Sequence, residues 1–417
     1  METLLNYQDQ YKFPMGQLIY EQEPDAEVTF KMLNRKARRG MRIADYVAPE
    51  ALQEYYDQLG ALTVTPEEIA ILERQTDKRY TKEYLGYLAS FRLPAMEVSI
   101  DPDNNDLTAV ATASWNASSL SEIPMLAPIP ELYYPQYIAA HGGTMEQVWN
   151  EGDRRLDETI RTFKSRPGIK VAEFGTRRRF SNDWQDHVVE RLTEELPGQL
   201  TGTSNPWLAA KYGIPAVGTN AHELGQVYGG LEELRGGNPL DGQNFVIRDW
   251  LERFPSMPVA LIDTFTSDVT LHDLTAEQID RLKSFRIDSG DERKVGRKVI
   301  SFLERHGVDP STRTLFFSNS LTPEKVVRLY DEFSDEIGVS FGVGGNLTNN
   351  MGFDQATDLP GLNIVSKAVA VNGHGTVKLS DDEGKHMGKK RDVVRYKRYA
   401  RNRLMTPEAS SPIRRYV

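Results

Sequence analysis

The sequence contains no cysteine, and this absence excludes several kinds of chemistry. Without cysteine the chain cannot form disulfides, offer a thiolate nucleophile or build cysteine-ligated zinc and iron–sulfur sites. Any catalysis must therefore use histidine, aspartate, glutamate, arginine and lysine side chains.

A long hydrophobic run is also missing. No stretch of the chain approaches the roughly 20 apolar residues that a transmembrane helix needs. The first 15 residues, METLLNYQDQYKFPM, lack the basic flank and the apolar core of a signal peptide. We therefore expect a cytoplasmic protein that does not contact a membrane.

Positive charge is in short supply as well. The formal net charge is -10 at pH 7, which argues against general nucleic-acid binding. Residues 389–403, KKRDVVRYKRYARNR, depart from this balance with eight basic residues and a single Asp. We interpret this segment as a solvated helix face, or as a patch that meets an acidic surface in a dimer; an RNA-binding tail is the alternative.

The 417 residues exceed the usual size of a single compact core, so we expect two domains, or a barrel with an added layer. About the first 125 residues mix strand-like runs with helical segments, which predicts an α+β domain. The strand-like runs are EVTFKML (27–33), AMEVSI (95–100) and LTAVATASW (107–115), and the helical segments include APEALQEYYDQLG (48–60) and TPEEIAILERQ (65–75).

From about residue 165 onward, short apolar runs recur, and most are separated by helix-like stretches. This alternation indicates parallel strands joined by crossover helices, in either an α/β barrel or a doubly wound sheet. The runs are GIKVAEF (168–174), IPAVG (214–218), MPVALID (257–263), FRID (285–288), TLFFS (314–318), VSFGV (339–343) and NIVSKAVAV (363–371).

Polar or glycine-rich residues follow run after run, and this regularity favours the barrel. Strand ends from many places in the sequence meet at one rim of a (β/α) barrel, whereas an open sheet gathers such groups at one or two crossover points. The clusters are Arg177 to Arg179, TGTSN (201–205), GTNAHE (218–223), Asp263, RIDSGD (286–291), SNS (318–320) and GVGGN (342–346).

Part of this rim is suited to an anionic ligand. Arginine side chains bind phosphate or carboxylate with two parallel hydrogen bonds. In an extended backbone Arg177 and Arg179 would share one side and Arg178 would point to the other. The glycines of GVGGN let backbone N–H groups approach an anion closely, although such a cluster is also typical of a tight turn.

Three further side chains favour a phosphorylated sugar. Asp288 suits the two hydroxyls of a ribose, and Arg286 lies two residues earlier on the same strand face; a structural ion pair is the alternative. His222 can act as a general base or accept a phosphate, because a neutral imidazole is nucleophilic near pH 7; a structural histidine is the alternative. Together these groups fit a multi-anionic sugar phosphate.

With these residues assembled, the chain resembles the nicotinate phosphoribosyltransferase family nearly end to end. The order and approximate spacing of several motifs carry the resemblance, and together they are specific. These motifs are DQYKFPM (9–15), FGTRRRFS (174–181), GTSN (202–205), GTNAHE (218–223), RIDSGD (286–291), SFGVGGNLT (340–348) and VKLSDDEGK (377–385).

The resemblance implies a type II phosphoribosyltransferase, with an irregular (β/α) barrel joined to an α/β sandwich domain. We expect an N-terminal α/β sandwich domain at residues 1–125 and a barrel catalytic domain at 126–365. Residues 366–417 would pack back on the N-terminal domain. The resemblance also implies a head-to-tail homodimer in which Tyr11 comes from the neighbouring subunit.

The reaction that the resemblance implies is transfer of 5-phosphoribosyl from phosphoribosyl diphosphate to the ring nitrogen of nicotinate, in NAD salvage. Nicotinate would lie between the rings of Phe174 and Tyr11, because a flat pyridine gains stacking on both faces. Arg286, with Thr203 and Ser204, would receive its carboxylate. The other substrate-binding residues that we expect are Arg177, Arg179, Asn319, Gly344 and Gly345.

The resemblance also implies two participants besides these substrates. Mg²⁺ would be bound chiefly through the diphosphate, so we expect no dedicated protein cage. ATP would phosphorylate His222 transiently, and hydrolysis of the phosphohistidine would drive the transfer, which makes the enzyme formally a ligase. With His222, we expect Arg286 and Asp288 to be catalytic.

Ser204 is expected to help select nicotinate over its amide. Related enzymes that use nicotinamide place an Asp at this point, which would repel a carboxylate, whereas a hydroxyl does not. Two residues depart from the family pattern. Asn319 stands where an Asp is usual, which leaves a contact with Mg²⁺ in question, and Gly345 stands where many members carry Thr.

Three alternatives to this function remain at the level of the sequence. The chain can instead be a nicotinamide phosphoribosyltransferase, a ligand-binding relative without catalysis, or a nucleic-acid-binding protein that uses residues 389–403. The intact set of Arg177, His222, Arg286 and Asp288 argues against a relative without catalysis.

Overall fold

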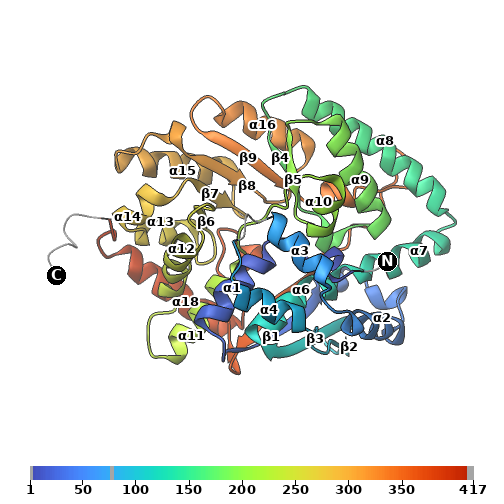
Figure 1. Ribbon diagram of the computed structural model, residues 1–417, viewed down its shortest axis with the longest axis horizontal. Helices are drawn as coiled ribbons and strands as arrows, with labels where there is room; N and C mark the ends of the chain where they lie inside the picture. The colour runs from blue at the N-terminus through green and yellow to red at the C-terminus, as the bar shows by residue number, and fades with distance from the viewer. Residues whose placement is uncertain (1–2, 76–78, 411–417) are drawn as a thin grey trace.

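The computed structural model describes residues 3–75 and 79–410, and two sheets organise them (Figure 1). One sheet has five antiparallel strands, in the order β11-β10-β1-β3-β2, and the other has six parallel strands, in the order β5-β4-β9-β8-β7-β6. The strands are β1 (Glu27–Asn34), β2 (Glu97–Asp101), β3 (Asp106–Ser114), β4 (Val171–Glu173), β5 (Leu200–Thr203), β6 (Val259–Leu261), β7 (Ser284–Ile287), β8 (Thr314–Phe317), β9 (Gly338–Val343), β10 (Ile364–Val371) and β11 (His374–Gly375).

Helices cover both sheets. The helices before the parallel sheet are α1 (Lys12–Gln22), α2 (Pro49–Ala61), α3 (Pro66–Gln75), α4 (Lys82–Ser90), α5 (Trp115–Leu120), α6 (Glu122–Leu126), α7 (Pro128–Ala140) and α8 (Met145–Lys164). The later helices are α9 (Asn182–Glu195), α10 (Pro206–Tyr212), α11 (His222–Leu234), α12 (Asp241–Arg253), α13 (Ser267–Asp273), α14 (Ala276–Arg281), α15 (Glu292–Arg305), α16 (Pro323–Phe333), α17 (Gly345–Thr348) and α18 (Lys390–Leu404). None of the helices within the described residues is both long and apolar enough to cross a membrane.

The antiparallel sheet buries one face, as the alternation in β1 indicates. Val28, Phe30 and Met32 are buried, and the residues between them are more exposed. β1 pairs with β3 on one side and with β10 on the other. The run 363–371, which we grouped with the barrel runs, therefore belongs to this sheet, and that grouping is wrong. β10 has eight residues and is longer than any strand of the parallel sheet, and its Lys367 is only partly buried.

The parallel strands are short and mostly buried on both faces, because helices such as α9, α15 and α16 cover their outer side (Figure 1). β5 and β6 lie at opposite ends of the strand order and are not paired with each other. Thr203, the last residue of β5, forms an isolated parallel bridge with Ala216. This bridge is the only strand-like pairing formed by the run 214–218 among the described residues, where we predicted a strand. The prediction of an irregular α/β barrel with a second α/β domain is confirmed.

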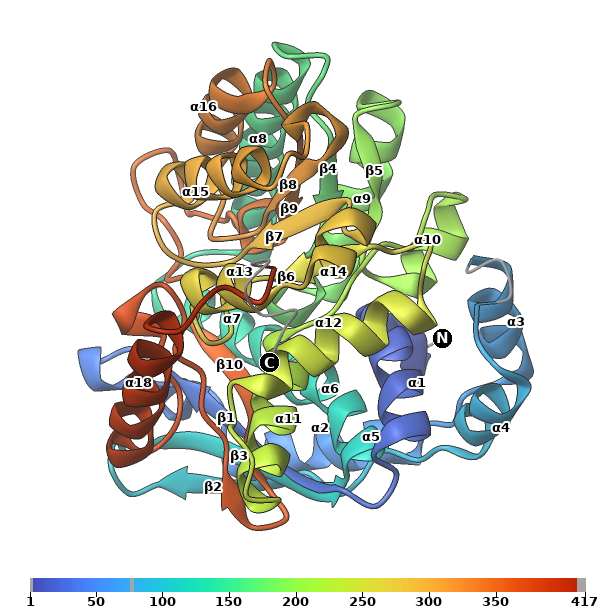
Figure 2. The same ribbon diagram turned by 90° about the vertical axis from the view of Figure 1, so that its left-hand side faces the viewer.

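The basic segment 389–403 forms most of α18, which packs against α13 (Figure 2). Val393 and Tyr396 are buried beside Phe265. Arg395 lies 2.8 Å from Glu233, and Arg403 lies 2.6 Å from Asp241. These pairs neutralise acidic side chains of α11 and α12 within the same chain, which supports our interpretation of a helix face with solvated outer residues.

The predicted domain boundaries stay predictions. β10 crosses the boundary expected between residues 365 and 366, because its whole length pairs with β1.

Candidate active site

A polar cavity of about 320 Å³ opens at the carboxyl ends of β4, β7, β8 and β9. We call it the first cavity. Its walls carry four predicted groups of substrate-binding or catalytic residues: the Phe174 ring, Arg177, the Arg286–Asp288 pair, and Gly344 with Gly345. Strand ends that are far apart in the sequence therefore meet at one rim, as the barrel interpretation predicts.

A second cavity, of about 230 Å³, shares part of this wall. Arg177 and Asp288 line both cavities, and His222 and Asn319 line the second alone. The second cavity is strongly cationic. Its basic lining residues are Arg35, Arg177, Arg178, Lys367, Lys378 and Lys385.

The three arginines are arranged differently from the predicted alternation. Residues 176–178 form a 3-10 helix, which turns successive side chains by about 120° rather than 180°. Arg177 and Arg178 both line the two cavities. Arg179 is fully buried elsewhere, 3.2 Å from Glu131 and with its guanidinium over the Tyr7 ring. Arg179 therefore lines neither cavity, whereas Arg178 lies beside Arg177 in both cavity walls, and the expected role of Arg179 in substrate binding stays a prediction.

Arg286 and Asp288 lie side by side at the end of β7. The Arg286 Nε donates to Ser318 Oγ at 2.9 Å, and Nη1 donates to the Asn220 carbonyl at 2.8 Å. Arg286 Nη2 lies 3.6 Å from Asp288 Oδ1, so the two groups form a loose ion pair. Burial would raise the pKa of Asp288, but the Arg286 guanidinium lowers it to about 2. Asp288 therefore stays charged at neutral pH, and both side chains line the first cavity.

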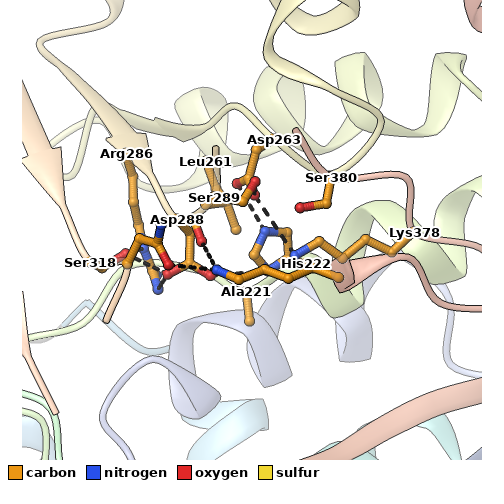
Figure 3. Close-up of polar contacts among 12 residues, drawn as sticks. Ala221, His222, Leu261, Asp263, Arg286, Asp288, Ser289, Ser318, Lys378 and Ser380 are labelled. Atoms are coloured by element: carbon orange, nitrogen blue, oxygen red, sulfur yellow. Dashed lines mark hydrogen bonds and ion pairs between the residues drawn. The ribbon is translucent and has the colours of Figure 1, made fainter. Parts of the chain in front are cut away.

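His222 begins α11 and lies between two carboxylates (Figure 3). Its Nε2 is 2.9 Å from Asp263 Oδ1, and its Nδ1 is 3.8 Å from Asp288 Oδ2. Burial lowers the pKa of His222, although the neighbouring Asp263 opposes this shift. The lowered pKa favours the neutral ring. Although burial opposes it, the Lys378 ammonium and hydrogen bonds from His222 and Ser289 lower the pKa of Asp263. The ionised Asp263 accepts the Nε2 hydrogen, so Nδ1 keeps its lone pair.

Comparison with known proteins identifies the family. Residues 169–408 match the model of the Nicotinate phosphoribosyltransferase (NAPRTase) family, and residues 7–130 match the model of its N-terminal domain. A nicotinate phosphoribosyltransferase of Xanthomonas campestris is 34% identical over 414 residues, which are 97% of this chain and 98% of the relative. The chain belongs to the nicotinate phosphoribosyltransferase family.

Solved structures agree with this assignment. The nicotinate phosphoribosyltransferase of Porphyromonas gingivalis superimposes with a TM-score of 0.85 at 29% identity, over 97% of this chain and 100% of that one. The enzyme of Vibrio cholerae gives a TM-score of 0.82 at 26% identity, over 95% of this chain and 93% of that one. The fold of this family member is thus shared with solved relatives.

The N-terminal segment of this family member reaches the barrel of its own chain. The Gln10 N–H donates to the Ser204 carbonyl at 2.6 Å, and a side chain on Gly218 would collide with the Tyr11 backbone. The Arg177 guanidinium lies 5.9 Å from the centre of the Tyr11 ring. We expected Tyr11 to come from a partner subunit, whereas here the same chain brings it beside the site. Stacking of nicotinate between Tyr11 and Phe174 stays a prediction.

Thr203 and Ser204 lie behind the cavity walls rather than on them. Both are buried, the Thr203 hydroxyl donates to Glu173, and the Ser204 hydroxyl donates to Asp9. Burial raises the pKa of Glu173 to about 7, and burial also raises the pKa of Asp9. The polar groups beneath the site therefore carry less negative charge than their number suggests.

Several residues of the site were not singled out from the sequence. Asp263 appeared only as one of the polar residues that follow a strand, and Lys378 and Lys385 only as letters of a motif. Lys367 lies within a strand, and no signal marked it. Burial lowers the pKa of Lys367 to about 8 although Glu122 opposes this shift. These side chains were missed because their importance depends on which strand ends meet.

Proposed function

We propose that the chain is an enzyme that transfers 5-phosphoribosyl from phosphoribosyl diphosphate to the ring nitrogen of nicotinate, giving nicotinate mononucleotide and diphosphate in NAD salvage. The observation that carries this proposal is the pair of joined cavities, with an aromatic ring in one wall and basic residues around both. Membership of the family supports the same reaction.

The reaction breaks the bond between C1 of the ribose and the diphosphate oxygen, and forms a bond between C1 and the nicotinate nitrogen. Positive charge develops on C1 and its ring oxygen, while negative charge develops on the diphosphate. Arg177 and Arg178 stand between the two cavities, where fixed positive charge stabilises that leaving group. Asp288, with a quarter of its side chain exposed, is placed to accept hydrogen bonds from ribose hydroxyls.

Nicotinate is proposed to lie against Phe174. The Phe174 ring packs edge-on against Phe316, with 5.6 Å between ring centres, so its orientation is fixed before substrate arrives. The Arg286 guanidinium keeps Nη2 free of short hydrogen bonds to protein among the described residues, and this nitrogen can donate to the nicotinate carboxylate.

Mg²⁺ fits this site as a partner of the diphosphate. Asp288 supplies one accessible carboxylate, whereas Asp263 already pairs with His222 and lies 3.7 Å from Lys378. A hard cation with one protein carboxylate and substrate oxygens is usual for Mg²⁺, which would neutralise charge on the leaving group. Asn319 donates to Glu292 and accepts from Lys385, so it is occupied by protein partners.

ATP is proposed to phosphorylate His222 at Nδ1. The unprotonated Nδ1 attacks the terminal phosphorus, the bond to the ADP oxygen breaks, and no proton has to leave the ring first. Asp263 holds the Nε2 hydrogen and stabilises the positive charge that the ring acquires. Hydrolysis of this phosphohistidine would drive mononucleotide formation. We also retain the expectations of a homodimer and of a cytoplasmic location.

Purified protein is expected to form nicotinate mononucleotide from nicotinate, phosphoribosyl diphosphate, Mg²⁺ and ATP. Chromatographic detection of the mononucleotide tests the proposal, and nicotinamide in place of nicotinate tests the nearest alternative. Faster turnover of nicotinamide would favour the nicotinamide enzyme, and absence of product with both pyridines would favour a ligand-binding relative. Salt-dependent retention on RNA would instead favour nucleic-acid binding.

Replacing Ser204 by Asp is expected to raise the KM for nicotinate by about 10- to 100-fold and to raise the KM for nicotinamide less. Asp9 already lies against Ser204, so the substitution would place a second carboxylate beside it and repel an anionic pyridine. Steady-state kinetics with both pyridines measure the effect. Ser204→Asn is the matched control, because it adds similar volume without charge. Equal losses for both pyridines in Ser204→Asp would contradict this account of selectivity.

A further inference from the structure

Glu173 is a buried carboxyl directly behind the wall of the first cavity, and the reaction described above assigns it no role. It is the last residue of β4, and its side chain is inaccessible to solvent. The next two residues, Phe174 and Gly175, line the first cavity. Glu173 therefore precedes the proposed stacking ring by one peptide bond, and its charge acts on a ligand held against that ring.

Three uncharged groups donate hydrogen bonds to the Glu173 carboxyl. The Gly175 N–H donates to Oε1, the Thr203 hydroxyl donates to Oε2, and Gln185 Nε2 donates to the same Oε2 at 3.1 Å. A protonated Oε2 can reverse its bond with Thr203, because a hydroxyl both donates and accepts. The same partners can therefore hold Glu173 in either protonation state.

The charged groups that face Glu173 belong to other pairs. Asp9, in the N-terminal segment, lies 3.5 Å from Arg177. Arg179, which follows the 3-10 turn, lies 3.2 Å from Glu131. The facing residues of β5, β9, α9 and α17 are uncharged, and they are Thr203, Val343, Gln185 and Thr348. An ionised Glu173 would therefore have no adjacent counter-ion among the described residues.

Near neutral pH this carboxyl changes its charge. Burial raises the pKa of Glu173 to about 7, and Asp9 adds to this shift, although the three hydrogen bonds oppose it. Above this pKa the ionised form, with a negative charge behind the cavity wall, predominates. Like charges about 10 Å apart in a protein repel enough to change an equilibrium about tenfold. A nicotinate carboxylate in the first cavity would be repelled only while Glu173 is ionised.

We propose that Glu173 is a determinant of substrate affinity, and that the enzyme binds nicotinate tightly only when Glu173 is protonated. The proposal rests on the proposed transfer to nicotinate. As nicotinate binds, an ionised Glu173 takes a proton from the solvent onto Oε2, so one negative charge leaves the site as the substrate brings another. An uncharged pyridine gains nothing from this protonation. Glu173 thereby sets the pH range in which the anionic pyridine is selected.

Glu173→Gln tests this linkage, because the amide keeps the size of the side chain and cannot ionise. KM and kcat for nicotinate are measured from about pH 6 to about pH 8.5, with saturating phosphoribosyl diphosphate and Mg²⁺ and with ATP omitted. The wild-type KM is expected to rise about five- to tenfold over this range, because the pKa of about 7 lies within it. The KM of Glu173→Gln should change by less than about twofold. At the lowest pH the two proteins should have similar kcat, since Glu173 contacts no reacting atom.

Glu68→Gln is the matched control. Glu68 is also buried and also accepts hydrogen bonds from uncharged donors, the N–H groups of Leu5 and Thr65, but it lines neither cavity. This variant should keep the wild-type rise in KM. Glu173→Asp keeps an ionisable carboxyl and should also show a rise. A Glu173→Asp protein without one would show that packing, and not ionisation, sets the affinity.

A wild-type KM that stays constant over this pH range would overturn the proposal, whether or not Glu173→Gln folds. A Glu173→Gln protein whose KM rises as in the wild type would also overturn it, because another group would then be responsible for the titration. Absence of nicotinate mononucleotide at every pH would instead reject the proposed transfer, and the role of Glu173 with it.

Discussion

Replacing His222 by Ala is expected to reduce ATP hydrolysis by at least about 10³-fold, because the substitution removes the nucleophilic ring nitrogen that Asp263 supports in the second cavity. Transfer of phosphoribosyl without ATP should continue, since the first cavity keeps Phe174, Arg286 and Asp288. Hydrolysis is followed by release of inorganic phosphate, and transfer is followed by formation of nicotinate mononucleotide with ATP omitted.

His187→Ala is the control for this substitution. His187 lies on α9, pairs with Asp153 at 2.9 Å and lines neither cavity. It should leave both activities unchanged. Persistent stimulation of mononucleotide formation by ATP in His222→Ala would show that the phosphoryl acceptor is another residue. Loss of transfer without ATP would instead show that His222 supports the first cavity directly.

Replacing Arg286 by Lys is expected to raise the KM for nicotinate by about 10- to 100-fold. Arg286 makes two hydrogen bonds to protein and has a further nitrogen available for the carboxylate, and a lysine ammonium cannot reproduce that planar fork. A hydrogen bond to a charged group contributes about 1.5–3 kcal/mol, which corresponds to this range of KM. Steady-state kinetics with nicotinate as the varied substrate measure the change.

Arg313→Lys is the control for Arg286→Lys. Arg313 is also buried, but it precedes β8 and bonds to Thr312 and to the Asp280 carbonyl at the opposite end of the barrel. The Arg313→Lys variant should have the same KM for nicotinate as the wild type. Thermal denaturation measures any loss of stability in this variant. An unchanged KM in Arg286→Lys would remove Arg286 from the carboxylate site.

The barrel was predictable because parallel strands leave a repeated signature. Each short apolar run ends in a polar cluster, since the carboxyl ends of the strands meet at one rim, and Arg286, Asp288 and Gly344 were found in this way. The placement of residues 363–371 was not predictable from apolarity alone. An apolar run predicts that a strand is buried. It does not predict which of the two sheets contains the strand with which it pairs.

The site was predictable only where side-chain direction follows from strand geometry. Arg178 rather than Arg179 lines the cavities because a single 3-10 turn changes the angle between successive side chains, and nothing in three consecutive arginines signals such a turn. Lys12 appeared only as a letter of a motif, and Glu122, with which it forms a buried ion pair, gave no signal. They are 110 positions apart along the chain, and their contact exists only once the N-terminal part of the chain has folded.

The position of β10 sets an order of events during synthesis. β1 pairs on one side with β3, which is made within the N-terminal part of the chain, but its other side waits for a strand more than 300 residues later. Until residue 371 has left the ribosome, the hydrogen-bonding edge of β1 is open and can pair with a foreign strand. The nascent chain is therefore most vulnerable to aggregation while the barrel is being made, and a chaperone that shields this edge would raise the yield of active enzyme.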